Sequence, residues 1–140
     1  MTETYSAPYS GPLPDLADPL TAPHWAAARE QRLAVQGCTA CGALRWQPAV
    51  ICPECLTTGG EWTDLAGTGT IWSYTVYHRA MNPAFRDQVP YAVAMVELDE
   101  GIRMVGKLTD HQDVAIGQRV HASYEAVTDD VTLVRWAPAP

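Results

Sequence analysis

The stretch that decides the fold runs from Cys38 to Cys55 and reads CTACGALRWQPAVICPEC. It contains all four cysteines of the chain, arranged as two C-x-x-C pairs with ten residues between them. Each C-x-x-C turn brings two sulfurs to one side, and two such turns a hairpin apart close a tetrahedral site of four sulfurs. The spacing therefore predicts a metal-binding ribbon over residues 37–60. Its ligands would be Cys38, Cys41, Cys52 and Cys55.

Zinc is the favoured metal, because structural four-cysteine ribbons in a reducing cell usually hold zinc, although iron fits the same ligands. Four thiolates fill the coordination shell and leave no position open for water or substrate. We therefore expect a structural metal that stabilises a segment with little core of its own. A redox-active dithiol is the alternative that the spacing leaves open.

On the N-terminal side of the ribbon, the sequence predicts a helix over residues 23–36. Pro23 suits a first helical turn, the Ala-rich segment after it has high helix propensity, and Gly37 stands where a helix would stop. Five of the 11 prolines fall by residue 23, so residues 1–22 are expected to form a flexible, Pro-rich arm. This arm is either a disordered tail or a segment that orders on a partner. In the second case its apolar anchors would be Tyr5, Tyr9, Leu13 and Leu16.

On the C-terminal side, from Trp62 onward, β-branched and aromatic residues alternate with polar ones, as in a β-strand. Five strands are predicted, over residues 70–78, 91–98, 102–108, 119–127 and 131–136. Residues 110–116 are expected to form a helical turn. Five strands with one such connection predict an OB-type barrel over residues 61–137. The expected fold class is mainly β, with an N-terminal helix, a Cys₄ zinc ribbon and a C-terminal five-stranded OB-fold barrel.

The charge balance limits the classes of partner. The chain has 16 acidic and 9 basic residues, a formal net charge of -7, and Lys107 as its only lysine. Binding along a phosphate backbone needs clustered cations, so the acid excess weighs against nucleic acid. The sequence shows neither an apolar run long enough to span a membrane nor a signal peptide, and we therefore expect a cytoplasmic protein.

The loop between the first two predicted barrel strands holds the nearest cationic patch. Arg79 and Arg86 flank its apolar part, and guanidinium groups suit contacts to the phosphates of a small molecule. The histidines are scattered and lie in no recognised catalytic motif, so we expect no catalytic residues in this chain. They are His24, His78, His111 and His121.

Motifs on both sides of the ribbon follow one another in a set order. The set comprises His24-Trp25, Arg32-Leu33, the two cysteine pairs, Trp62, Gly67-x-Gly69-Thr70-Ile71-x-Ser73-Tyr74-Thr75-Val76, His78-Arg79, Val89-Pro90-Tyr91-x-Val93-Ala94-x-Val96-Glu97-Leu98-Asp99-Glu100-Gly101 and Asp113-Val114-x-Ile116-Gly117-x-x-Val120. Over residues 20–137 it resembles the acyl-CoA-associated OB-fold family, whose members carry an N-terminal rubredoxin-like zinc ribbon. The resemblance implies an accessory subunit of thiolase-superfamily enzymes, such as thiolases, lipid-transfer-protein-type aldolases or acyltransferases of lipid and steroid metabolism.

We therefore expect a non-catalytic subunit that stabilises a complex with a thiolase-like or lipid-transfer-protein-like enzyme and helps to bind acyl-CoA. Arg79 and Arg86 are the candidate contacts for CoA, and Trp25 and Trp46 are the candidate residues of the partner interface. Two alternatives stay open. One is a module that binds single-stranded nucleic acid, because OB barrels also serve that role. The other is a rubredoxin-like electron-transfer protein with iron in the cysteine site.

Overall fold

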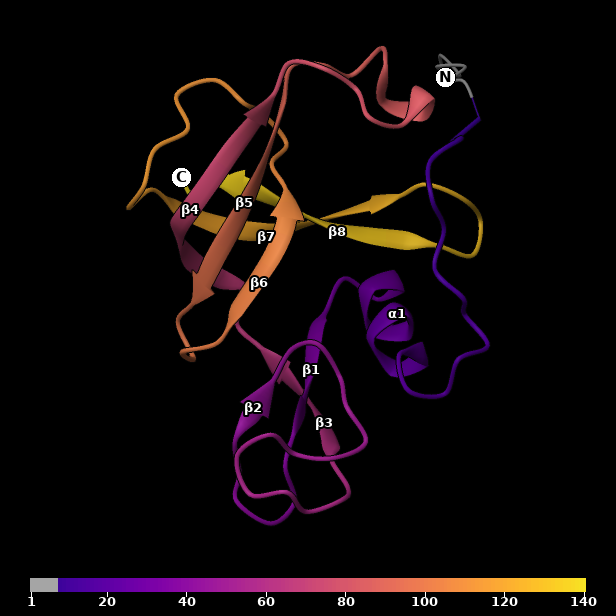
Figure 1. The fold of residues 1–140 in the computed structure, drawn as a ribbon, viewed down its shortest axis with the longest axis vertical. Helices are drawn as coiled ribbons and strands as arrows, with labels where there is room; N and C mark the ends of the chain where they lie inside the picture. Colours follow the sequence, from indigo (N-terminus) through magenta and orange to yellow (C-terminus); the bar gives the residue numbers. More distant parts are fainter. Residues whose placement is uncertain (1–7) are drawn as a thin grey trace.

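The computed structural model describes residues 8–140. Within them the strands form a three-stranded sheet of order β2-β1-β3 and a five-stranded sheet of order β6-β5-β4-β7-β8 (Figure 1). In chain order the elements are α1 (Ala22–Arg29), β1 (Leu33–Gly37), β2 (Leu44–Arg45), β3 (Glu61–Leu65), β4 (Thr68–Tyr77), η1 (Pro83–Phe85), β5 (Tyr91–Leu98), β6 (Arg103–Lys107), β7 (Arg119–Ala126) and β8 (Thr132–Pro138). No helix in this part of the chain has the length and apolar character needed to cross a membrane.

Helix α1 is shorter than the sequence predicts. It ends before Gln31, because Gln31 adopts a left-handed backbone conformation (φ 59°) that turns the chain out of the helix. The N–H of Arg32 then donates to the carbonyl oxygen of Ala27 at 2.9 Å, as in a Schellman C-cap. The predicted helix over residues 23–36 is therefore wrong in its last part, which forms strand β1 instead.

Strand β1 lies at the centre of the three-stranded sheet, antiparallel to both β2 and β3. Its residues Leu33 and Val35 are buried in the same apolar cluster as Ile71 and Trp136 of the barrel. The ribbon sheet and the barrel therefore share one core. Because β3 pairs with β1, the predicted start of the barrel at residue 61 falls within the sheet of the ribbon.

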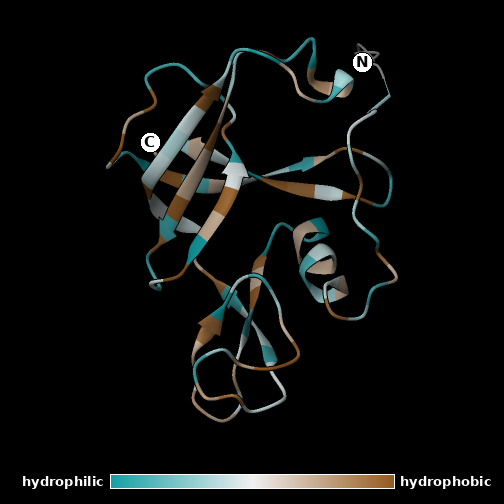
Figure 2. Cartoon of the chain, viewed as in Figure 1, coloured by the Kyte–Doolittle hydropathy of each residue, from teal (hydrophilic) through white to brown (hydrophobic). Residues whose placement is uncertain are grey.

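The five-stranded sheet curls into a nearly closed barrel. Strand β4 pairs with β5 along its length and with β7 only at its start, while β6 pairs with β5 and β8 with β7. A parallel bridge between Leu108 and Trp136 brings the two outer strands together. Burial alternates along β5, so that every second side chain reaches the core, and Figure 2 shows apolar positions along the barrel strands. The mainly β fold class with its five-stranded barrel is confirmed.

The connection between β6 and β7 differs from its prediction. Residues 110–116 form turns and contain no helical turn. The side chain of Asp110 accepts a hydrogen bond from the N–H of Gln112 at 2.9 Å, and Asp113 has a positive φ of 59°. Both features favour turns over helix, because they divert the backbone from helical hydrogen bonding.

The N-terminal arm passes along the outside of the molecule before it reaches α1 (Figure 1). Residues 8–11 line a pocket together with the β4–β5 loop and residues 125–127 at the end of β7. Of the four predicted anchors for a partner, Tyr5 lies outside the described residues, and Leu13 and Leu16 are exposed. Tyr9 is half-buried, and of the described arm residues 8–11 lie against the barrel.

Gly69 in β4 faces the neighbouring strand without room for a side chain. A Cβ there would lie 2.5 Å from the carbonyl oxygen of Glu97 and 2.7 Å from a methyl group of Val96. We expect Gly69→Ala to lower the free energy of unfolding by about 1–3 kcal/mol, because the two strands must move apart. Gly37→Ala is the matched control, since the nearest atom to its Cβ would be at 3.6 Å. Urea unfolding checks this, and two equally stable variants would contradict it.

His24 is buried where α1 meets the ribbon and the barrel. Its Nδ1 donates to the carbonyl oxygen of Ala34 at 3.1 Å, and its ring packs against Trp46 with 4.2 Å between the centroids. Burial lowers the pKa of His24 from its usual value of 6.5, and the hydrogen bond to Ala34 acts in the opposite direction. The folded protein therefore favours the neutral imidazole.

This burial predicts a loss of stability in acid. Below about pH 6.5, His24 binds a proton in the unfolded chain but stays neutral in the folded protein. The contribution of His24 to the free energy of unfolding is therefore complete above that pH and declines as the pH falls. We expect His24→Gln to lose less stability than the wild type between about pH 7.5 and about pH 5.5. Denaturant unfolding at both values measures this, with His111→Gln as the control. Equal losses in all three proteins would refute the assignment.

Candidate metal centre

Four sulfurs meet in the ribbon, and all four Sγ atoms lie within 4.8 Å of one another. The Sγ atoms of Cys38 and Cys55 are 3.6 Å apart, and those of Cys41 and Cys52 are 3.7 Å apart. A tetrahedral metal with bonds of about 2.3 Å to sulfur holds its four ligand atoms about 3.8 Å apart. A disulfide needs about 2.05 Å. The arrangement therefore fits a tetrahedral metal site made of four thiolates.

Two knuckles of the same construction hold these sulfurs. The N–H of Gly42 donates to the carbonyl oxygen of Cys38, and the N–H of Leu56 donates to that of Cys52, each at 2.9 Å. Gly42 and Leu56 each follow the second cysteine of a pair, and both have a positive φ, of 76° and 63°. The same left-handed residue thus closes the turn around each cysteine pair.

Backbone amides favour the thiolate form that a metal requires. The N–H groups of Ala40 and Cys41 donate to the sulfur of Cys38 at 3.4 and 3.5 Å. The hydrogen bond from the Cys41 amide has the largest effect and that from the Ala40 amide the next largest. Together they lower the pKa of the Cys38 thiol to about 6. Cys38 and Cys52 are buried, whereas Cys41 and Cys55 are exposed, so the centre lies at the surface of the ribbon.

Arg45 is only 6% exposed and connects the ribbon strands to both loops of the centre. Its Nε donates to the side-chain oxygen of Gln36 at 2.8 Å, and its Nη2 donates to the carbonyl oxygens of Ala49 and Gly59 at 3.0 Å. A Cβ at Gly60 would lie 2.7 Å from the same Nη2, so this position favours glycine. The cysteine motifs did not single out Arg45. The available signal was a basic residue in a segment with almost no apolar core.

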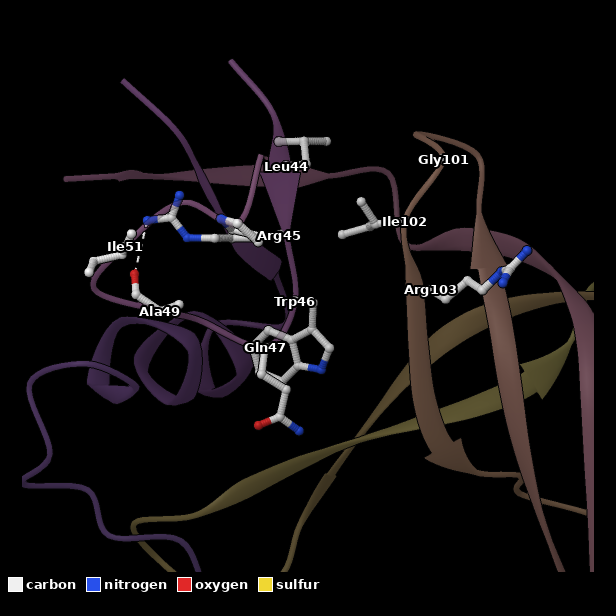
Figure 3. A pocket seen from close by; sticks show the side chains of 10 residues that line it. Leu44, Arg45, Trp46, Gln47, Ala49, Ile51, Gly101, Ile102 and Arg103 are labelled. Atoms are coloured by element: carbon white, nitrogen blue, oxygen red, sulfur yellow. Dashed lines mark hydrogen bonds between the residues drawn. The ribbon is translucent and has the colours of Figure 1, made fainter. Parts of the chain in front are cut away.

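A cleft of about 530 Å³ lies between the loop that follows β2 and the β5–β6 turn (Figure 3). Trp46 of the ribbon lines the cleft on one side and Ile102 of the barrel on the other. The guanidinium group of Arg45 donates a hydrogen bond to the carbonyl oxygen of Ala49 in the same lining. The guanidinium carbon of Arg103 lies 3.9 Å above the ring centre of Trp72. The lining contains no histidine and no carboxylate, so it holds no pair of groups for acid–base catalysis.

The two tryptophans predicted for the partner interface lie at the junction of α1, the ribbon and the barrel. The ring of His24 is 4.9 Å from that of Trp25 and 4.2 Å from that of Trp46, centroid to centroid. Trp46 also packs on the main apolar core, and both indoles are half-buried. Their part in a partner interface stays a prediction.

The two arginines predicted to contact CoA lie elsewhere. Arg79 and Arg86 are exposed on the β4–β5 loop, at the end of the barrel far from the ribbon (Figure 1). The Nζ of Lys107 on β6 donates to the side chain of Gln88 and lies 5.3 Å from the ring centre of Tyr91, which ties the loop to the barrel. The metal centre and these arginines are therefore separate places, and the CoA contact stays a prediction.

The shared core and the four sulfurs define a class of protein, an OB-fold barrel with an N-terminal four-cysteine ribbon. Residues 25–59 match the family model of the ChsH2 rubredoxin-like zinc ribbon domain, and residues 62–125 match that of the ChsH2 C-terminal OB-fold domain. The chain belongs to the DUF35 family, as these models and a relative described below show. The resemblance that the sequence motifs indicated is confirmed.

Three known proteins show the extent of the likeness. The chain is 38% identical over 115 residues to the "Probable enoyl-CoA hydratase alpha subunit" of Thermomonospora curvata, and the match covers 81% of this chain but only 35% of that protein. It is 36% identical over 96 residues to a "DUF35 domain-containing scaffold protein" of Methanocaldococcus jannaschii, covering 66% of this chain and 67% of that one. A solved structure described as "Ltp2-ChsH2(DUF35) aldolase" matches 91% of this chain and 100% of that chain, with a TM-score of 0.80 and 35% identity.

The contacts of Arg45 lead to a prediction about metal affinity. We expect Arg45→Lys to weaken metal binding by about tenfold or more, because an ammonium group cannot reach Gln36 and both carbonyl oxygens at once. Competition with a chelator, followed by metal analysis, measures the affinity. Arg79→Lys on the distant loop is the control and should bind the metal as the wild type does. Unchanged affinity in Arg45→Lys would show that the knuckles hold their shape without the guanidinium.

Proposed function

We propose that this chain is a non-catalytic accessory subunit of a thiolase-superfamily enzyme that acts on acyl-CoA thioesters. The observation that carries the proposal is the likeness to a chain of the "Ltp2-ChsH2(DUF35) aldolase", which this chain matches over that chain's full length. The relative named as a scaffold protein supports a role in assembly. The inferred partner is a thiolase-like or lipid-transfer-protein-like subunit. This partner carries out the chemistry, as a thiolase, an aldolase or an acyltransferase.

The distribution of reactive groups supports a non-catalytic role. Among residues 8–140, the four cysteines are the one set of three or more cysteine, histidine or acidic side chains that is placed to share a metal. All four thiols are used as ligands in that case, which leaves none as a nucleophile. The match spans about a third of the length of the hydratase subunit from T. curvata.

We further propose that the metal is zinc and that it is structural. Four thiolates leave no open position for a substrate, and a closed Cys₄ shell is typical of zinc ribbons. When bound, the metal supplies cross-links between two knuckles that bury few apolar side chains. Free thiols that serve as ligands also fit a reducing, cytoplasmic location.

Within the complex, we assign acyl-CoA contacts to Arg79 and Arg86, whose exposed guanidinium groups suit bidentate binding of phosphate. Trp25 and Trp46 contribute to the partner interface through the parts of their rings that stay accessible. The net charge of -7 weighs against the alternative of a nucleic-acid-binding module.

Purification from the source cell tests the proposal. We expect an affinity-tagged chain to retain a thiolase-like subunit in fixed stoichiometry through size-exclusion chromatography, identified by mass spectrometry. We also expect that subunit to lose activity on acyl-CoA when the tagged chain is removed. The Cys52→Ser variant, which lacks one ligand, is the control for an intact ribbon.

Two results would count against this function. One is a chain that elutes alone and leaves the activity of every acyl-CoA enzyme in the extract unchanged. The other is a salt-sensitive gel shift with single-stranded DNA or RNA, which would indicate the nucleic-acid alternative.

A further inference from the structure

Strand β4 has two halves with different surroundings. In its first half, Thr68–Thr70 pairs with β5 on one side and with β7 on the other. Ile71 ends this double pairing, since its N–H donates to the carbonyl oxygen of Gln118 and its own carbonyl oxygen accepts from the N–H of Gly117, each at 2.9 Å. Beyond that point, among residues 8–140, β4 pairs only with β5. Residues 72–77 are therefore a free sheet edge, and we call them the β4 edge.

The β4 edge is exposed on both faces of the sheet. The register against β5 shifts between Ile71 and Ser73, so a β-bulge separates the two halves. Trp72 is 49% exposed, Tyr74 39% and Tyr77 37%. These residues come from both faces, because side chains alternate along a strand. No other part of the described chain covers this length of backbone with a strand.

The composition of the β4 edge lacks the usual protection against pairing. Proteins blunt exposed edges with lysine, other charges or proline, because free N–H and C=O groups attract another strand. Residues 72–77 read WSYTVY and contain none of these, in a chain with a net charge of -7. An uncharged, aromatic and β-branched edge is favourable for a sixth strand and unfavourable if it faces water permanently.

The sheet face next to the β4 edge is also apolar. A shallow groove of about 300 Å³ is lined there by residues of β4, β5 and β6, including Val93, Met95 and Val105. Val105 is 58% exposed, and Arg103 stacks on Trp72 at the border of the groove. An added strand would find free main-chain groups at the edge and apolar contacts for its side chains on this face.

We propose that the β4 edge is where an extended strand of the partner enzyme subunit adds to the barrel, in antiparallel or parallel pairing with Trp72–Tyr77. This inference rests on the proposed function, which supplies the partner. The occupant is a strand because main-chain donors and acceptors are what the edge offers. It is an uncharged or basic segment, because the edge itself carries no charge and the chain as a whole is acidic.

A second copy of this chain is a poorer occupant. The six-residue edge is about 20 Å long, and an edge of that length paired with itself buries well under the roughly 1,200 Å² that a stable interface needs. A larger enzyme subunit can combine strand addition with contacts to the apolar groove. The interface then reaches a stable size, with the edge setting its register.

Hydrogen–deuterium exchange of the purified complex tests the proposal. We expect those amides of residues 72–77 that point away from β5 to exchange quickly in the isolated chain and to become protected, by about tenfold or more, when the co-purified thiolase-like subunit is bound. The amides of β8, which already pair with β7, should change little. Exchange is measured on the full chain with its metal in place.

Substitution at the edge provides the second measurement. We expect Thr75→Lys to weaken the complex by about tenfold or more, because lysine on an edge strand opposes strand addition. Thr63→Lys is the matched control. It makes the same substitution at an exposed position of β3, outside the β4 edge and its groove, and should weaken the complex far less. Thermal unfolding and metal content show that both variants fold.

The outcomes separate this inference from the proposed function. A complex that forms while residues 72–77 stay unprotected would overturn the inference alone. Equal weakening by both lysine variants would also overturn it, because the loss of binding would then not depend on the β4 edge. Protection of the edge in the isolated chain, with a dimer on size-exclusion chromatography, would assign it to a second copy. Failure of the wild-type chain to bind any thiolase-like subunit would overturn the proposed function and this inference together.

Discussion

The conformation of the ribbon depends on four sulfurs meeting at one point. Between Cys38 and Gly60 the buried side chains are those of Cys38, Arg45 and Cys52, so no apolar core can fix the two loops in this segment. Sulfur–sulfur distances of 3.6 and 3.7 Å match what one tetrahedral ion requires. The cross-link replaces the missing core. Arg45 then holds the loops to the ribbon strands by hydrogen bonds. Strand β1 connects the ribbon to the barrel, because Leu33 and Val35 pack in the barrel core.

The two regions that the family models match, the ribbon and the barrel, form one structural unit because they share a core. The family models divide the chain at residues 59–62, but β3 pairs with β1 of the ribbon, and residues of both sheets fill one apolar cluster. The same unit matches a scaffold protein over two thirds of its length and a hydratase subunit over about a third. The unit thus recurs in chains of different length, which fits a module whose own fold does not depend on what accompanies it.

Sequence patterns predicted the parts of this molecule that local chemistry determines. The cysteine spacing specified the ribbon, and alternation placed the ends of the barrel strands to within about two residues. The patterns failed where tertiary context decided the structure. Helix α1 ends before Gln31, which adopts a left-handed conformation although it is not a glycine, so the sequence does not mark the end of the helix. The residues after it form a buried strand. Arg45 and the β4 edge were missed, because each is defined by partners distant in sequence or by the lack of them.

One lysine has a practical consequence. Lys107 carries the only side-chain amine of the chain, and its place on β6, beside the loop it ties down, is fixed by the barrel. An amine-reactive fluorophore or cross-linker therefore attaches at one known position besides the N-terminal amine, without any engineered residue. With a donor dye attached there, fluorescence energy transfer measures the distance from the outer strand of the barrel to an acceptor on a neighbouring subunit.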